Sequence, residues 1–193
     1  MEFVSRKVIQ LDKLISELDR LVFKFVKVLE KHADYVIVSG YVSILFGRAR
    51  ATEGVDILIE ELSEAEVNVF YEDLTNNGFW CLNSGDVKDI YSYLEDGLAV
   101  RFAVKGSSIP NFEVKFARKR LSVEALKDVL TVVTRIGKIR ISSIERQIAF
   151  KRYYLKSDKD LEDAEHIERV FKGHVDKEKI NKYRELISRD EKT

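Results

Sequence analysis

Residues 35–59 read YVIVSGYVSILFGRARATEGVDILI: an apolar run, a Ser39-Gly40 turn, a second apolar run, a basic loop, and an apolar segment that carries Asp56. A serine-glycine turn lets the backbone approach a phosphate closely and offers free amide donors. Side chains alternate along a strand, so Asp56 faces away from its two apolar neighbours. The segment therefore predicts strand, turn, short helix, loop and strand, with groups suited to a phosphate and a metal ion at one edge.

This segment resembles the signature of the nucleotidyltransferase superfamily, which has the DNA polymerase beta-like fold. Within that superfamily it resembles the branch of AbiEii-type toxin nucleotidyltransferases. Ser39-Gly40 stands where the family has Gly-Gly or Gly-Ser, residues 47–52 match its basic loop, and Asp56 matches the second of its two aspartates. Gly54 stands where the family has the first aspartate, so the chain lacks one metal-binding carboxylate of the pattern.

Glu53 is the nearest acid that would substitute for the missing aspartate. Strand alternation directs residue 53 to the opposite face from residues 54 and 56, so Glu53 would reach the site only through a bulge at Gly54. The alternative is a solvated loop residue. For Asp56 the alternative to a site role is a strand-end carboxylate that caps a turn or pairs with Arg50.

The resemblance continues later in the chain. Residues 111–116 look like the strand with the family's third carboxylate, here Glu113, and residues 141–151 and 157–164 look like its C-terminal helices. It implies a catalytic and metal-binding pair, Asp56 and Glu113, which holds Mg²⁺ or Mn²⁺ through hard oxygen ligands. It also implies a nucleotide-binding set: Ser39, Gly40, Arg50, Thr52 and Lys151.

Each of these residues also has a structural interpretation. Glu113 can form an ion pair with Lys115 on the same strand face, and Arg101 suits either role. Arg48 and Arg50 can be solvated loop residues, with Arg50 favoured as the phosphate clamp. Lys151 can extend over the core. The acidic run 158–163 reads as a solvated helix start with acids at the favourable end.

Composition limits the class of protein. The 193 residues carry 33 basic and 33 acidic side chains, so no global field favours nucleic acid, and 45% are hydrophobic, as in globular proteins. No apolar run approaches the ~20 residues of a membrane helix, and no signal-peptide core is evident, so we expect a cytoplasmic protein without membrane contact. The single Cys81 and three scattered histidines predict neither a disulfide nor a zinc site.

We predict an α+β fold: a nucleotidyltransferase-like mixed β-sheet flanked by helices over residues 1–142, with an N-terminal helix, and a C-terminal helical bundle over residues 143–193 packed on this core. Apolar periodicity and turn signals predict the elements. The predicted helices are 11–31, 41–46, 63–76, 87–94, 144–156, 158–172 and 176–188. The predicted strands are 35–38, 55–60, 79–82, 98–104, 111–117, 130–135 and 138–141.

Two functions are expected from this pattern. In the first, the protein binds a nucleoside triphosphate with Mg²⁺ and transfers a nucleoside monophosphate to a small-molecule, RNA or protein acceptor. In the second, the loss of the carboxylate at Gly54 leaves a binding or regulatory protein, as in a toxin-antitoxin pair, whose partner is another protein or a second copy of the chain. A third hypothesis is an unrelated α+β scaffold in which the motif is coincidental.

Overall fold

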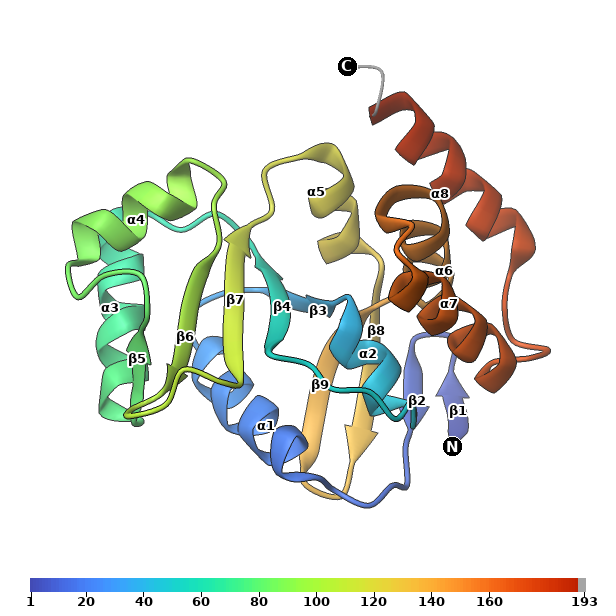
Figure 1. Ribbon diagram of the computed structural model, residues 1–193, viewed down its shortest axis with the longest axis horizontal. Coiled ribbons are helices and arrows are strands. Elements are labelled where there is room, and N and C mark those ends of the chain that lie inside the picture. The colour runs from blue at the N-terminus through green and yellow to red at the C-terminus, as the bar shows by residue number, and fades with distance from the viewer. Residues whose placement is uncertain (191–193) are drawn as a thin grey trace.

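The computed structural model describes residues 1–190, which form one mixed sheet flanked by helices (Figure 1). The strand order is β1-β2-β8-β9-β3-β4-β7-β6-β5. The strands are β1 (Glu2–Ser5), β2 (Val8–Gln10), β3 (Tyr35–Val38), β4 (Gly54–Ile59), β5 (Phe79–Cys81), β6 (Val100–Val104), β7 (Asn111–Phe116), β8 (Val129–Thr134) and β9 (Gly137–Ser142). The helices are α1 (Glu17–Leu29), α2 (Gly40–Leu45), α3 (Glu64–Asn76), α4 (Val87–Glu95), α5 (Arg120–Lys127), α6 (Ile144–Phe150), the π-helical turn η1 (Lys151–Leu155), α7 (Asp158–Val170) and α8 (Lys177–Asp190).

The centre of the sheet sets the position of the acids. β3 pairs antiparallel with β4, and β4 pairs parallel with β7. In this register Val38 lies opposite Asp56, and Asp56 lies opposite Glu113. Because paired residues project to the same face of a sheet, the two carboxylates stand side by side.

The other face of the sheet forms the main apolar core. Alternation along β4 buries Val55, Ile57 and Ile59 there. The ring of Phe25 on α1 stacks on Phe112 of β7 with centroids 4.1 Å apart. α3 contributes to the same layer through its own aromatic side chains. The C-terminal helices lie away from α1 in Figure 1, and α2 and α5 contact β3 and β4.

The predicted α+β class and the order of elements in the centre of the chain are confirmed. Both predicted strand pairs, β6 with β7 and β8 with β9, are antiparallel hairpins. The capping box at Ser63 is present, with its Oγ accepting from the Glu66 amide. None of the helices within residues 1–190 is long and apolar enough to cross a membrane.

The N-terminal helix begins later than predicted. Residues 2–10 form β1 and β2 at the sheet edge, and α1 starts after Ser16, whose Oγ accepts a hydrogen bond from the Asp19 amide. The Asp19 side chain bonds back to the Ser16 amide, which completes a capping box. Leu14, which the periodicity assigned to the helix, is 89% exposed. The helical spacing of apolar residues thus continues N-terminal of Ser16, although the helix begins only after this cap.

Two further differences lie near the site. α5, which the apolar pattern did not reveal, follows β7 and packs beside β3 and β4. The predicted helix 144–156 changes to the π-helical turn η1 at Lys151 and ends at Lys156, which has the left-handed φ of 63°. A π-helical turn rotates the following side chains relative to an α-helix.

Candidate functional site

Asp56 and Glu113 open into one cavity of about 270 Å³ beside the Ser39 turn. The sheet contributes one wall through these acids and Lys115, while α5 contributes Ser122. The opposite wall comes from α6 and η1, with Arg146, Gln147, Phe150, Lys151, Tyr154 and Leu155. The turn and two acids that are far apart in sequence thus share one opening.

The pKa of Asp56 is raised above its ordinary value. The main cause is burial of the carboxyl group, and the second is the negative charge of Glu113. A hydrogen bond from the Ser39 side chain and the charges of Lys115 and Lys151 act in the opposite direction without cancelling the effect. A cation bound beside the two carboxylates would offset the burial and repulsion that raise the pKa of Asp56.

Gly54 leaves room for two neighbouring oxygens. A Cβ at this position would lie 3.1 Å from Oδ1 of Asn111 and 3.2 Å from Oε1 of Glu113. Oδ1 of Asn111 is buried and accepts no hydrogen bond from the described residues. An orphaned buried acceptor is uncommon and calls for a donor or a cation. The site therefore has a third oxygen, an amide in place of a carboxylate, at the position where the aspartate is missing.

The sequence analysis missed Asn111, although a signal was present. Asn111 stands two residues before Glu113 on β7, so both project to the same face, and it pairs in register with Gly54. Within residues 1–190 no three His, Cys, Asp or Glu side chains cluster as metal ligands. The third oxygen of this group is an amide oxygen, that of Asn111.

β4 has no bulge at Gly54, so the route by which Glu53 would reach the site is absent. β4 pairs with β7 in unbroken register from Gly54 to Ile59, and Glu53 is exposed. The backbone carbonyl of Glu53 accepts from the Asn111 amide, which holds the start of the strand straight. Glu53 is therefore the solvated loop residue of the alternative interpretation.

The Ser39-Gly40 turn has an unusual backbone. Ser39 has φ 63° and ψ −136°, a region that non-glycine residues rarely occupy. At Gly40 a Cβ would lie 3.2 Å from both terminal nitrogens of the Arg50 guanidinium. Glycine is needed here so that the guanidinium can lie against the turn. The strain at Ser39 directs its side chain toward Asp56.

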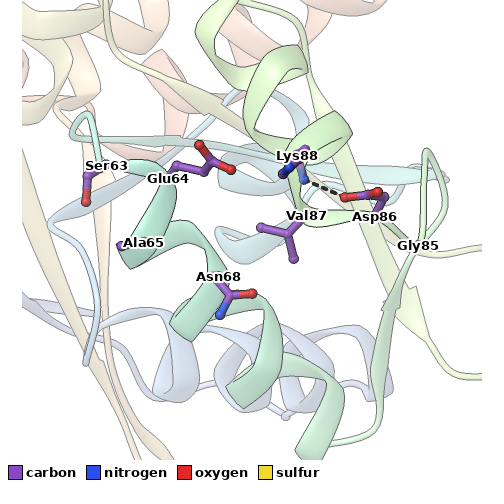
Figure 2. Close-up of a pocket in the computed structure, with 8 residues that line it drawn as sticks. All are labelled: Ser63, Glu64, Ala65, Asn68, Gly85, Asp86, Val87 and Lys88. Carbon is purple, nitrogen blue, oxygen red and sulfur yellow. Dashed lines mark hydrogen bonds between the residues drawn. The ribbon is translucent and has the colours of Figure 1, made fainter.

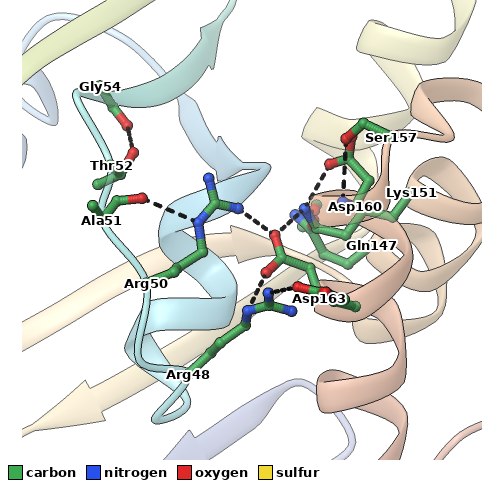
Figure 3. A network of polar contacts seen from close by, with 12 residues as sticks. Arg48, Arg50, Ala51, Thr52, Gly54, Gln147, Lys151, Ser157, Asp160 and Asp163 are labelled. Atoms are coloured by element: carbon green, nitrogen blue, oxygen red, sulfur yellow. Dashed lines mark hydrogen bonds and ion pairs between the residues drawn. The ribbon is translucent and has the colours of Figure 1, made fainter.

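The predicted phosphate-binding cations meet at a carboxylate that the sequence analysis placed on a solvated face. Asp163 on α7 is completely buried, and that interpretation of the acidic run is wrong at this position. Its Oδ2 lies 2.6 Å from Nη1 of Arg50 and 2.7 Å from Nζ of Lys151 (Figure 3). Nε of Arg48 lies 3.0 Å from Oδ1, although the geometry is too poor for a hydrogen bond.

Neighbouring acids balance the remaining charge of this cluster. Lys151 also lies 3.3 Å from Asp160, and Nη2 of Arg48 lies 2.5 Å from Glu162. These ion pairs hold the basic loop to α7, so both arginines are structural partners of the C-terminal helices. Arg50, which the sequence favoured over Arg48 as the phosphate clamp, shares Asp163 with Arg48.

Two other predicted residues have clear local partners. The hydroxyl of Thr52 donates to the Gly54 carbonyl at 2.7 Å, which closes the loop before β4. Glu113 pairs with Arg101 at 3.4 Å on the neighbouring strand. Lys115 has no ion pair within residues 1–190, so the alternative pairing of Glu113 with Lys115 is wrong. Asp56 likewise makes no pair with Arg50, whose partner is Asp163.

A larger hollow of about 890 Å³ lies elsewhere, between the starts of α3 and α4 (Figure 2). Its polar groups serve the helices themselves. Ser63 caps α3, and the Asp86 side chain accepts from the Lys88 amide at the start of α4. Glu64 and Lys88 extend at its rim without converging. Size alone would select this hollow, but the convergent acids, the strained turn and the buried cations select the smaller one.

No protein-family model matches this chain, and no curated protein matches its sequence. Solved structures do match its fold. The solution structure of the antibiotic-resistance factor ANT(2'')-Ia aligns with a TM-score of 0.57 and 13% identity, over 93% of this chain and 95% of that one. An antigenic nucleotidyltransferase-like protein from Paracoccidioides brasiliensis aligns with a TM-score of 0.51 and 15% identity, over 91% and 90%. The chain therefore has the nucleotidyltransferase-like fold.

Proposed function

We propose that this protein binds a nucleoside triphosphate with Mg²⁺ and transfers a nucleoside monophosphate to an acceptor. One observation carries the proposal: Asp56 and Glu113 are register partners that face a cavity beside the Ser39-Gly40 turn. The fold and the order of the motif agree with this function. The likeness to AbiEii-type enzymes, which rests on the sequence pattern, belongs to the proposal as well.

The oxygen set fits one hard divalent cation. Asp56 and Glu113 supply carboxylates, and the orphaned Oδ1 of Asn111 supplies a neutral oxygen beside Gly54. When bound, Mg²⁺ would neutralise phosphate charge and polarise the phosphoryl group. Replacing a carboxylate with an amide removes one negative charge, so we expect weaker metal affinity than a site with three carboxylates.

The chain's own residues would divide the remaining work. The Ser39-Gly40 turn offers backbone donors to the phosphates, and Arg50 and Lys151 stand next to it. The acceptor's hydroxyl oxygen bonds to the α-phosphorus, the bond from that phosphorus to the β-phosphate oxygen breaks, and pyrophosphate leaves. The hydroxyl proton passes to a carboxylate oxygen of Asp56 or Glu113.

A second candidate function is a binding or regulatory protein without turnover, in which a protein partner or second copy replaces the acceptor. Two observations favour it. Gly54 removes a charge from the metal site, and Asp163 already neutralises Arg50 and Lys151. A triphosphate would have to share these cations with a buried internal carboxylate.

Calorimetric titration with magnesium-ATP, followed by a transfer assay with labelled nucleoside triphosphates, separates the two functions. We expect binding and turnover in the unaltered chain, both lost in Asp56→Asn, while the exposed neighbour variant Glu53→Gln behaves like wild type. Binding without turnover would support the second function. Absence of binding would contradict both.

Restoring the missing carboxylate sharpens this test. An aspartate at residue 54 would crowd Asn111, so we pair Gly54→Asp with Asn111→Ser to make space. If the amide oxygen is a weaker substitute, the double variant should bind Mn²⁺ more tightly than wild type. Asn111→Ser alone should bind it more weakly. Unchanged affinity in the single variant would remove Asn111 from the metal site.

A further inference from the structure

Arg146 lines the cavity but has no role in the proposed function. It lies on α6, is only 4% exposed and lines the same cavity as Asp56. Its Nη2 donates to the Leu121 carbonyl at 3.2 Å, and the guanidinium lies over the ring of Phe150. Within residues 1–190 it forms no ion pair with a carboxylate. A buried charge without an ionic partner lowers the stability of the fold, so its presence here points to a role in binding a ligand.

The carboxylate whose charge acts on Arg146 is Asp128, and it already has other partners. Asp128 accepts from the hydroxyls of Ser143 and Tyr183 and pairs with Lys179 at 2.9 Å. Burial lowers the pKa of Arg146 to about 10, and the charges of Tyr183 and Asp128 oppose this only in part. The guanidinium therefore stays protonated at neutral pH, with N–H donors left over beside the cavity.

Lys115 adds a second cation to the same part of the cavity. It follows Glu113 by two residues on β7 and so projects to the same face, roughly 7 Å further along the strand. Its ammonium group forms no ion pair within the described part of the chain. Ser122 of α5 adds a hydroxyl to the same wall.

These groups lie on the side of the acids that is away from the Arg50 cluster. Arg146 precedes Lys151 by five residues, which separates them by roughly 7–8 Å along the helix axis. Lys151 belongs to the cluster around Asp163, next to Arg50. The order across the site is therefore Arg50 with Lys151, then Asp56 with Glu113, then Lys115 with Arg146.

We propose that Arg146 and Lys115 form a subsite for an oxyanion, a phosphate or carboxylate group carried by a small-molecule acceptor. The identification of the ligand as an acceptor rests on the proposed function, whereas the anion-binding role of the two residues does not depend on it. Guanidinium groups bind both oxyanions through paired hydrogen bonds, and an ammonium adds charge. The rings of Phe150 and Tyr154 line the wall beside it, so the acceptor pairs an anionic group with an apolar or aromatic part. The size of the cavity suits a small molecule.

The test follows the side-chain Nε–H signal of Arg146 by NMR while inorganic phosphate or acetate is added to the full chain. We expect a saturable shift with at least one of the two, and the tighter ligand identifies the oxyanion. Lys115→Met should weaken this binding about tenfold. Lys115 is exposed, so this variant keeps the fold. The control Arg135→Met removes an exposed arginine at the β8–β9 turn and should change nothing.

Thermal stability distinguishes an anion-binding arginine from a purely structural one. Without phosphate, Arg146→Met should be at least as stable as wild type, because an uncompensated buried charge is replaced by an apolar side chain of similar length. Phosphate should raise the melting temperature of wild type more than that of Arg146→Met. No saturable shift of the Arg146 signal, or equal affinity in Lys115→Met, would overturn the proposal. So would a marked loss of stability in Arg146→Met with an unchanged response to phosphate.

Titration of Arg146→Met with magnesium-ATP tests whether Arg146 binds the acceptor or the nucleotide. Unchanged affinity supports the acceptor assignment, whereas a fall parallel to that for phosphate assigns Arg146 to the nucleotide and overturns it. If wild type binds phosphate at Arg146 but no nucleotide, the proposed function fails and the anion subsite remains.

Discussion

The acidic and basic halves of the site are built in different ways. Asp56 and Glu113 stand together because two adjacent strands pair in register, and nothing beyond the sheet is needed to place them. Arg48, Arg50 and Lys151 stand together because one buried carboxylate, Asp163, attracts all three from distant parts of the chain. Hydrogen bonds between backbones place the acids, whereas long-range ion pairs place the cations. The acidic half should therefore tolerate side-chain changes that the basic half does not.

Loss of Asp163 should have the largest effect. Asp163→Ala leaves three cations without their central partner, one of them the buried Lys151, and we expect the free energy of unfolding to fall by about 3–5 kcal/mol. Denaturant unfolding measures the change. Glu162→Gln is the matched control on the same helix, because this carboxylate is largely exposed and should contribute under ~1 kcal/mol. Similar losses in both variants would contradict a central role for Asp163.

A glycine at Ser39 should have a moderate effect of opposite sign. Ser39→Gly and Ser39→Ala both lose the Ser39 hydrogen bond to Asp56, but Ser39→Gly also relieves the backbone strain at φ 63°, which should leave a net gain of about 1 kcal/mol in its free energy of unfolding. Ser39→Ala keeps the strain but loses the hydrogen bond to Asp56, so it should be less stable than wild type. Thermal unfolding of both variants gives the comparison. Equal stability of the glycine and alanine variants would show that the turn stores no strain.

The smallest expected effect is a change in pH dependence at Asp56. Its pKa is raised in the folded state, so the folded protein binds the proton more tightly than the unfolded chain does. Stability attributable to this group is therefore highest below the ordinary aspartate pKa of 3.8 and falls as pH rises through the raised value. Asp56→Asn should remove this fall and exceed wild type in stability at neutral pH but not at acid pH. Unfolding curves across this range, compared with those of Glu53→Gln, provide the measurement. A constant difference at every pH would contradict the shift.

Much of this site follows from local patterns that the sequence displays. Alternation along residues 54–59 places Asp56 on the polar face, and the turn at Ser39-Gly40 needs no distant partner. Asn111 was missed although strand alternation already aligned it with Glu113, because an amide was not considered as a ligand. The predicted helix begins too early because apolar spacing continues N-terminal of Ser16, whereas the capping hydrogen bonds at Ser16 fix the first turn of α1.

The sequence by itself determined the alternation of strands, the position of the Ser39-Gly40 turn and the face on which each acid stands, because these depend on neighbours along the chain and on backbone geometry. Only the tertiary structure decided which charges meet. Asp163 lies 113 residues from Arg50, and its burial depends on how α7 packs against the basic loop. Among residues 1–190, Arg146 likewise lacks a carboxylate partner because of where α6 holds it beside the cavity. Ion pairing depends on distances between elements remote in sequence, and those distances exist only in the folded chain.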